Sequence, residues 1–377
     1  MKKLIALLLA CVMLLSLAAC ASKTTDTTDT TTTNDPAADT AADTTENTDS
    51  TDTSSEDAST DGESNGYTGG EYTLVVASHN NATTAAGSGL QKLCELIEEY
   101  SDGKIKCELY TDGKLGSQSE TASEVRNGGI DICENDWATM ASANGYAKGS
   151  VVSLGYMFQN YDHVMAFYKS DVFKQMTQEL IDQTGIRCLA GSASGFRHIF
   201  TKTPVTTLDD LNGLRIRVPD IQVYVDTFQA LGCATTIVAS SEVYTALQTG
   251  IVDAVENPYI TVYNASWYEQ LSYITKTYHI WCDLDYFMNE AKYESLDDEA
   301  KAVIDRAAED AQAYGMSYSE EMEDYYEDLL VNECGLEIVD IDTDAIKAKM
   351  QETVWKNFED TVDGGADLIA SIQALAN

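Results

Sequence analysis

The sequence predicts an α/β fold. Between residues 72 and 133, short aliphatic runs alternate with amphipathic helical segments in the order strand, helix, strand, helix, strand. This order is typical of a parallel sheet with helices on both faces. Ligands bind such sheets at the carboxyl ends of strands. We therefore expect the loops after the first and third strands, 78–81 and 134–137, to contact a ligand.

Turn residues bound the elements of this first part. Asp102-Gly103 and Asp112-Gly113 are turn dipeptides, and Gly128 is placed to end a helix. The expected strands and helices, in order, are 72–77, 90–100, 105–110, 119–127 and 130–133.

The remaining chain continues the mixture of strands and helices. Ser295, with Asp298 three residues later, resembles the start of a capping box and predicts a long helix behind it. Further strands are expected at 186–190, 199–201, 214–218, 251–255 and 278–287. Further helices are expected at 161–184, 223–231, 241–250, 261–274, 295–329, 343–358 and 366–376.

The segment 211–219, L-N-G-L-R-I-R-V-P, contains two arginines, and arginine is rare in this chain. The chain has 62 Asp plus Glu but only 23 Lys plus Arg, and three of its arginines are Arg197, Arg215 and Arg217. Alternation with Leu214, Ile216 and Val218 places both guanidinium groups of the segment on one face of a strand. The planar, permanently charged guanidinium indicates an anion contact. The alternative is a solvated face of an edge strand.

The strongly acidic composition of the chain argues against two classes of binding partner. A formal net charge of −39 argues against nucleic acid, whose phosphates would repel the chain. It also argues against a polybasic membrane-surface role.

The N-terminus predicts export. Lys2 and Lys3 precede an apolar run, 4–19, of the length of a signal-peptide core. The run ends in Leu-Ala-Ala before Cys20, which resembles a bacterial lipobox; an ordinary cleaved signal peptide is the alternative. We expect residues 1–19 to be a lipoprotein signal peptide. Lipidated Cys20 would then anchor the chain at the outer face of the cytoplasmic membrane.

Residues 20–70 are expected to form a disordered tether. The segment is dominated by Thr, Asp, Ser and Ala, with almost no large apolar residue before Tyr67. Such a chain cannot offset its conformational entropy by burial.

The cysteines do not indicate a disulfide framework. Besides Cys11 and Cys20, seven remain, an odd number without a C-x-x-C motif. We interpret them as small buried apolar side chains. The seven are Cys94, Cys107, Cys133, Cys188, Cys233, Cys282 and Cys334.

An ordered set of motifs resembles the DctP-type solute-binding proteins of TRAP (tripartite ATP-independent periplasmic) transporters. The motifs begin at Tyr110 (Y-T-D-G-K-L-G), Gly129 (G-I-D), Gly195 (G-F-R), Leu211 (L-N-G-L-R-I-R-V-P), Ser241 (S-E-V-Y-T-A-L-Q) and Asp253 (D-A-V-E-N-P). The chain departs from the family pattern at Thr111, at Ala254-Val255 and in 152–158.

The resemblance implies a periplasmic-binding-protein-like clamp of two α/β lobes, with a ligand cleft between them and a long helix linking them. Lobe I would comprise 71–195 plus 280–319, and lobe II 196–279 plus 320–377. By the same resemblance, Arg217 would bind a ligand carboxylate, and Arg215 would be solvated.

The further ligand contacts that the resemblance implies are Arg197, Asn257, Asp136, His79 and Asn80. For Asn257 a local turn cap is the alternative.

The implied function is an extracytoplasmic receptor that delivers a small organic acid to TRAP permease subunits in the membrane. No residue set calls for catalysis, a cofactor or a metal. The alternatives are a ligand sensor for a signalling receptor, an exported hydrolase and a surface adhesin. G-x-S-x-G and H-E-x-x-H are absent and the four histidines are scattered, which disfavours a hydrolase. The arginine and E-N-P motifs disfavour an adhesin.

Overall fold

The computed structural model describes residues 65–82 and 84–376. The predicted signal peptide, Cys20 and the tether as far as residue 64 lie outside the described residues. Within the described part, no helix is both long enough and apolar enough to cross a bilayer.

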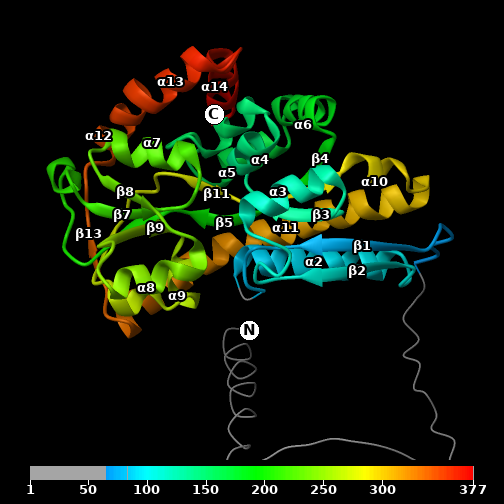
Figure 1. Cartoon of the computed structure of the whole chain (residues 1–377), viewed down its shortest axis with the longest axis horizontal. Coiled ribbons are helices and arrows are strands. Elements are labelled where there is room, and N and C mark those ends of the chain that lie inside the picture. The colour runs from blue at the N-terminus through cyan, green and yellow to red at the C-terminus, as the bar shows by residue number, and fades with distance from the viewer. Residues whose placement is uncertain (1–64, 83, 377) are drawn as a thin grey trace, which may run out of the picture. The chain divides into compact units, whose positions relative to one another are not determined.

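The first sheet has five strands in the order β2-β1-β3-β12-β4 (Figure 1). The strands β1 (Tyr72–Ala77), β2 (Ile105–Tyr110) and β3 (Ile132–Asn135) run parallel, as predicted. The strand β12 (Asp285–Asn289) enters from far along the chain and is antiparallel to both β3 and β4 (Ile186–Ala190). The sheet is therefore mixed.

Helices cover both faces of this sheet. On one face, α2 (Ala85–Tyr100) and α11 (Asp298–Asp328) share a core with Leu74, Val76 and Tyr286. On the other face lie α3 (Gln118–Asn127) and α4 (Trp137–Asn144). Alternate side chains of each strand thus enter different cores, as strand geometry requires.

The second sheet has six strands in the order β13-β10-β6-β9-β7-β8. Their bounds are β13 (Glu337–Val339), β10 (Tyr273–Thr275), β6 (His198–Thr201), β9 (Ala254–Asn257), β7 (Arg215–Val218) and β8 (Ala234–Ile237). The strands β8, β7 and β9 are mutually parallel, so their carboxyl ends lie at one edge.

The helices of the second sheet also divide between its faces. The helix α7 (Gln222–Ala230) packs with Ile216 and Val218 of β7. On the opposite face, α8 (Val243–Gln248) and α9 (Tyr259–Asn264) pack with Val255.

Three segments connect the two sheets, and the fold is the predicted two-lobed one. The strands β5 (Ala193–Phe196) and β11 (Trp281–Asp283) pair with each other between the sheets. The third segment is α11, which Figure 1 shows running past both sheets. The long helix was predicted, but its N-cap is Asp297, which accepts from the Ala300 amide at 2.8 Å, and not Ser295.

The remaining helices follow the predicted pattern, with breaks. The helical stretch 161–184 divides into α5 (Tyr161–Tyr168) and α6 (Asp171–Thr184), and α10 (Glu290–Glu294) follows β12. The C-terminal helices are α12 (Thr343–Met350), α13 (Lys356–Thr361) and α14 (Gly365–Gln373). The C-terminal end reaches α5, because the His163 ring lies 2.8 Å from the Ile372 carbonyl oxygen.

Two predictions about elements were wrong. The helix expected over 261–274 ends with α9 at Asn264, and the chain then turns and enters β10. The single strand expected over 278–287 is divided between β11, in the connection, and β12, in the first sheet.

The end of the predicted tether is part of the folded structure. Tyr67 is buried in the core of α2 and α11. The Thr68 amide donates to Glu299 at 2.8 Å, and the Gly70 amide donates to Asp297 at 2.7 Å. Residues 65–70 therefore belong to the folded part rather than to a tether.

Candidate functional site

Arg217 lies at the carboxyl end of β7 and is only 4% exposed. Its Nε donates to the Val238 carbonyl oxygen at 2.8 Å, just beyond β8. Its guanidinium carbon lies 5.9 Å from the centre of the Trp267 ring. Among residues 65–82 and 84–376, no carboxylate lies within ion-pair distance of this guanidinium. Arg217 is thus a buried cation without a carboxylate partner in this part of the chain.

Arg197 is buried as deeply but is fully paired. Its Nε lies 2.5 Å from Glu256 Oε2, and its Nη2 lies 2.7 Å from Glu256 Oε1. Its Nη1 lies 3.2 Å from the Cys282 sulfur. His279 Nε2 also lies 3.2 Å from Glu256 Oε2. Glu256 therefore neutralises Arg197 and has little capacity left for Arg217.

The pKa values of the two arginines differ for this reason. Burial lowers the pKa of Arg217 to about 10; the charge of Glu256 opposes this effect, and that of Arg197 adds to it. Burial also lowers the pKa of Arg197, but the adjacent Glu256 outweighs it and holds that pKa well above its usual range. Arg217 remains protonated at neutral pH, so its burial leaves a positive charge to be compensated.

Two further residues predicted from the sequence, Arg215 and Asn257, lie on β7 and on the neighbouring strand β9. Arg215, predicted to be solvated, is exposed and pairs with Asp253 at 2.6 Å. Asn257 ends β9 beside β7, and the amide of its side chain makes no hydrogen bond within the described residues. The turn cap considered for Asn257 is therefore not formed there.

The loop after β1 brings His79 and Asn80 to a carboxylate that the sequence analysis missed. Asn80 Nδ2 donates to Glu134 Oε1 at 2.6 Å, and the Ser78 hydroxyl lies 3.3 Å from the same oxygen. Asn80 Nδ2 also lies 3.2 Å from His79 Nε2. If Nε2 accepts this contact, the imidazole proton is on Nδ1. A charged residue in the fully buried strand 132–135 was the signal that could have identified Glu134.

This first-sheet cluster has unused hydrogen-bonding capacity. His79 Nδ1 and Glu134 Oε2 are buried and have no partner among the described residues. Burial lowers the pKa of His79 to about 4. Burial raises the pKa of Glu134 to about 7, although the hydrogen bonds from Asn80 and Ser78 lower it. Both shifts favour the uncharged form, so the loop presents neutral polar groups between about pH 4 and pH 7.

Asp136, at the carboxyl end of β3, has a local structural role. It is the N-cap of α4 and accepts from the Thr139 amide at 2.7 Å and from the Thr139 hydroxyl at 2.8 Å. Gln118 also donates to it. Burial raises the pKa of Asp136, and these hydrogen bonds lower it. The oxygen atoms of Asp136 accept hydrogen bonds from its own chain, which leaves them less capacity for a ligand than the guanidinium of Arg217 has.

Two further buried aspartates lie near Asp136: Asp283 ends β11 in the connection, and Asp285 begins β12 in the first sheet. The Trp137 amide donates to Asp283 at 2.7 Å, and the Trp137 indole donates to Asp285 at 2.7 Å. Burial raises the pKa of Asp283, and raises that of Asp285 to about 7. In the described residues, no three His, Cys, Asp or Glu side chains are arranged to hold a metal.

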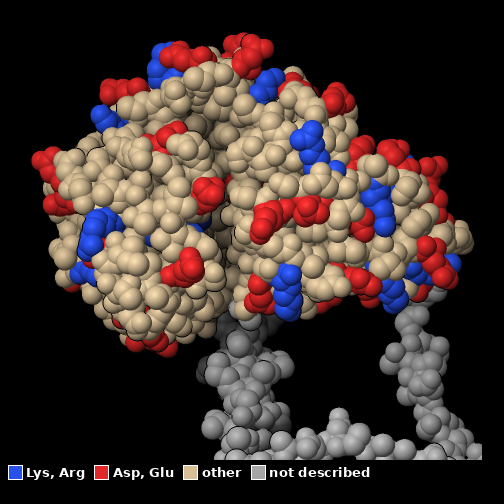
Figure 2. All heavy atoms as spheres, in the orientation of Figure 1, with Lys and Arg blue, Asp and Glu red and all other residues tan. Residues whose placement is uncertain are grey.

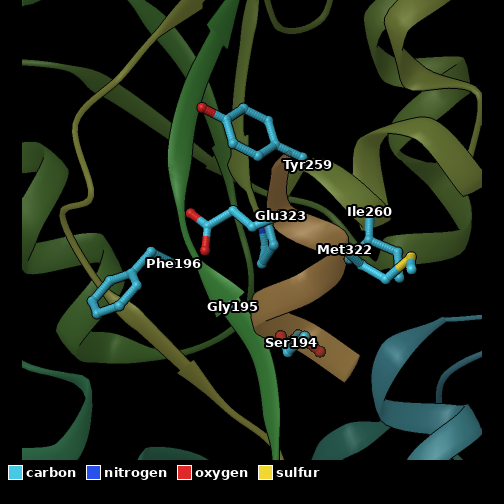
Figure 3. A pocket seen from close by; sticks show the side chains of 9 residues that line it. Ser194, Gly195, Phe196, Tyr259, Ile260, Met322 and Glu323 are labelled. Atoms are coloured by element: carbon cyan, nitrogen blue, oxygen red, sulfur yellow. The ribbon is translucent and has the colours of Figure 1, made fainter. Parts of the chain in front are cut away.

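A cavity near the connection does not include Arg217. It is lined by residues of β5, the start of α9 and α11, and Figure 3 shows the Glu323 carboxylate pointing from α11 between Phe196 and Tyr259. Its volume is about 10 Å³, room for roughly one water molecule. We therefore base the candidate site on Arg217 and not on this cavity. On the face seen in Figure 2, a furrow separates two halves, and acidic side chains are scattered over both.

The buried pair of Arg197 and Glu256 gives a stability prediction. Glu256→Gln leaves Arg197 buried and unpaired, so we expect the free energy of unfolding to fall by about 3–5 kcal/mol. Asp253→Asn is the matched control, because its partner Arg215 has 51% of its side chain exposed. That variant should lose at most about 1 kcal/mol. Urea unfolding at pH 7 measures both, and equal losses would contradict the assignment.

Glu134 gives a pH prediction. Its folded pKa of about 7 exceeds the ordinary value of 4.5, so its stabilising contribution is present at low pH and is lost as pH rises through 7. Relative to wild type, Glu134→Gln should therefore gain stability between pH 5 and pH 8, by roughly 3 kcal/mol at most. Thermal unfolding across this range tests it. A difference between Glu134→Gln and wild type that stays constant from pH 5 to pH 8 would refute the prediction.

Comparison with known proteins bears out the predicted family. Residues 76–361 match the model of the DctP family, described as bacterial extracellular solute-binding protein, family 7. The chain is 26% identical over 317 residues to the sialic acid-binding periplasmic protein SiaP of Vibrio cholerae, which covers 80% of this chain and 96% of SiaP.

Solved structures that resemble this chain are also TRAP periplasmic solute-binding proteins. A TRAP periplasmic solute-binding protein of Sulfitobacter sp., solved with bound α-D-taluronate, is 27% identical with a TM-score of 0.72, covering 80% of this chain and 97% of that one. A TRAP periplasmic solute-binding protein of Desulfovibrio desulfuricans, solved with sn-glycerol-3-phosphate, has a TM-score of 0.77 at 22% identity, covering 81% and 97%. With its two α/β sheets, their crossing strands and the long shared helix, the chain belongs to the DctP family of TRAP-transporter solute-binding proteins.

Proposed function

We propose that this protein captures a small organic acid by binding the ligand's carboxylate at Arg217. The observation that carries the proposal is the contrast between two buried arginines. Arg197 has its own carboxylate, Glu256, whereas Arg217 has none among the described residues. A buried cation without a counter-charge is destabilising until an anion reaches it.

The chemistry of the guanidinium supports a carboxylate as that anion. Nε of Arg217 is engaged by the Val238 carbonyl, and no hydrogen bond of its terminal nitrogens to the described residues is found. A guanidinium can donate two parallel, charge-assisted hydrogen bonds to one carboxylate. In a closed cleft each such bond is stronger than in water.

The first sheet supports a ligand that also carries hydroxyl groups. Beside Asn80, His79 Nδ1 and Glu134 Oε2 each have unused hydrogen-bonding capacity. Hydroxyl groups can satisfy both, because each donates and accepts. Relatives solved with taluronate and glycerol-3-phosphate bind hydroxylated acids. Asn257, with a free side-chain amide, would add a contact from the second sheet, while Asp136 and Arg197 would position their neighbours.

Capture would require the lobes to move. Arg217 is 4% exposed, so a ligand reaches it only when its surroundings open. The closed, liganded form would then be the signal that TRAP permease subunits recognise, with the ligand released unchanged and no catalysis.

We further propose the predicted arrangement of the chain: signal peptide 1–19, a lipid anchor on Cys20, a tether, lobe I (71–195 plus 280–319) and lobe II (196–279 plus 320–377). The Leu-Ala-Ala-Cys sequence supports the anchor. An acyl anchor on an extracytoplasmic receptor keeps it close to a membrane permease.

The anchor predicts membrane partitioning. Expressed with its own N-terminus, the wild type should fractionate with membranes. Cys20→Ser should not be lipidated and should lose this association. Detergent phase separation with mass spectrometry of the N-terminal peptide measures both. Cys11→Ser controls for cysteine loss within the signal peptide, and a Cys20→Ser protein that stays in the membrane fraction would exclude a lipid anchor.

The proposed role of Arg217 predicts how ligands change the unfolding midpoint. In a thermal-shift screen of sugar acids, keto acids and C4-dicarboxylates, at least one acid should raise the unfolding midpoint of the wild type. Arg217→Gln should abolish that rise, because it removes the charged fork. Arg215→Gln should retain it, because Arg215 is exposed and paired with Asp253. Equal ligand-induced shifts in wild type and Arg217→Gln would disprove the carboxylate clamp.

A further inference from the structure

We propose that Cys94 and Cys107 form a reversible disulfide that links α2 to the edge strand β2. Both thiols are free in the structure, which corresponds to the reduced form. The inference uses the extracytoplasmic location of the family, where disulfides persist, but not the identity of the ligand. It departs from our interpretation of all seven cysteines as small buried apolar side chains, since Cys107 and Cys334 are only partly buried.

The two cysteines face each other across a helix–strand contact. Cys94 lies in the core formed by α2, and Cys107 packs against that same core from β2. The Cys107 amide donates to Glu98 Oε1 at 3.0 Å. Glu98 lies one helical turn after Cys94, so both project from the same side of α2. The backbone of β2 is thereby held against the face of α2 that carries Cys94.

The two thiols are neighbours in this core. Both side chains pack into the same core, and the proximity of Cys107, followed by burial, raises the pKa of the Cys94 thiol. The two positions differ in access, since Cys94 is buried whereas Cys107 is partly exposed on β2, at the edge of its sheet. The partly exposed Cys107 is therefore the entry point for an oxidant, and the buried Cys94 is the resolving thiol.

The oxidation balances with a low-molecular-weight disulfide as oxidant. The Cys107 thiolate attacks one sulfur of that disulfide, forming a mixed disulfide and releasing one thiolate. The Cys94 thiolate then attacks Cys107 Sγ, forming the Cys94–Cys107 bond and releasing the second thiolate. The two thiolates released take up the two protons lost by the cysteines. The protein loses two electrons, and the external disulfide gains them.

The bond would brace the part of lobe I that carries the first-sheet cluster. β1, which leads into Ser78 and Asn80, pairs with β2 along its whole length. The Ser78 amide donates to the Tyr110 carbonyl at the end of β2, and the Asp112 amide donates to the Asn80 carbonyl. Fixing β2 to α2 therefore fixes both sides of the loop that holds His79 and Asn80.

The test uses the purified mature chain, incubated with oxidised glutathione and then alkylated and digested without reduction. Mass spectrometry should find a peptide pair joined through Cys94 and Cys107. The unfolding midpoint should rise by about 5 °C, as expected for closing a short loop, and dithiothreitol should reverse the rise. Recovery of both cysteines as alkylated thiols, or of glutathione remaining on Cys107, would overturn the proposal.

Matched serine variants complete the test. Cys107→Ser, at a partly exposed position, should fold, give no cross-linked peptide and show no oxidant-dependent rise in midpoint. Cys334→Ser replaces another partly exposed cysteine, next to the second sheet, and should keep both signals. An oxidant-dependent rise in Cys107→Ser that equals the wild-type rise would assign the effect to other thiols and reject the pair.

Discussion

The balance of buried charge at the edge of the second sheet is the constraint on which the site depends. Two guanidinium groups are buried there, and Glu256 compensates only Arg197. The Arg197 pair also ties structure together, because Arg197 follows β5, Glu256 is in β9 and the sulfur of Cys282 is in β11. The same carboxylate that fixes the connection between the lobes thus leaves Arg217 without a carboxylate partner in the described part of the chain. An incoming anion is the simplest way to complete the balance.

The first sheet complements this arrangement with neutral polarity. Glu134, His79 and Asn80 meet where β1 and β3 end, and the pKa shifts of Glu134 and His79 both favour the uncharged form. A cation on one lobe and uncharged donors and acceptors on the other suit a ligand with one acidic end and a polar remainder. In the proposed mode of binding, the ligand carboxylate would supply attraction, and the ligand hydroxyl groups would supply discrimination by position.

Sequence reasoning succeeded where the signal is local. The alternation in 214–218 predicted β7, and the family motif distinguished Arg217 from Arg215. It failed where the outcome depends on distant neighbours. β10 was mistaken for the end of a helix, because pairing with β6 and β13 decides its conformation. The pairing of Arg197 with Glu256 joins residues 59 positions apart, and the contact of Asn80 with Glu134 joins residues 54 apart. No spacing rule predicts such partners.

Arg215 and Arg217 show why burial, and not residue type, determines function here. They are two residues apart on one face of one strand, yet one pairs with Asp253 at the surface while the other lies beneath Trp267 and the chain after β8. A surface guanidinium gains little from an anion because water and salt screen it. A buried one gains much, and only when the groups above it close over the ligand. In the proposed mode of binding, the burial of Arg217 would strengthen its attraction for an anion and would also make binding dependent on lobe movement. Occupancy would then be coupled to the shape that a permease recognises.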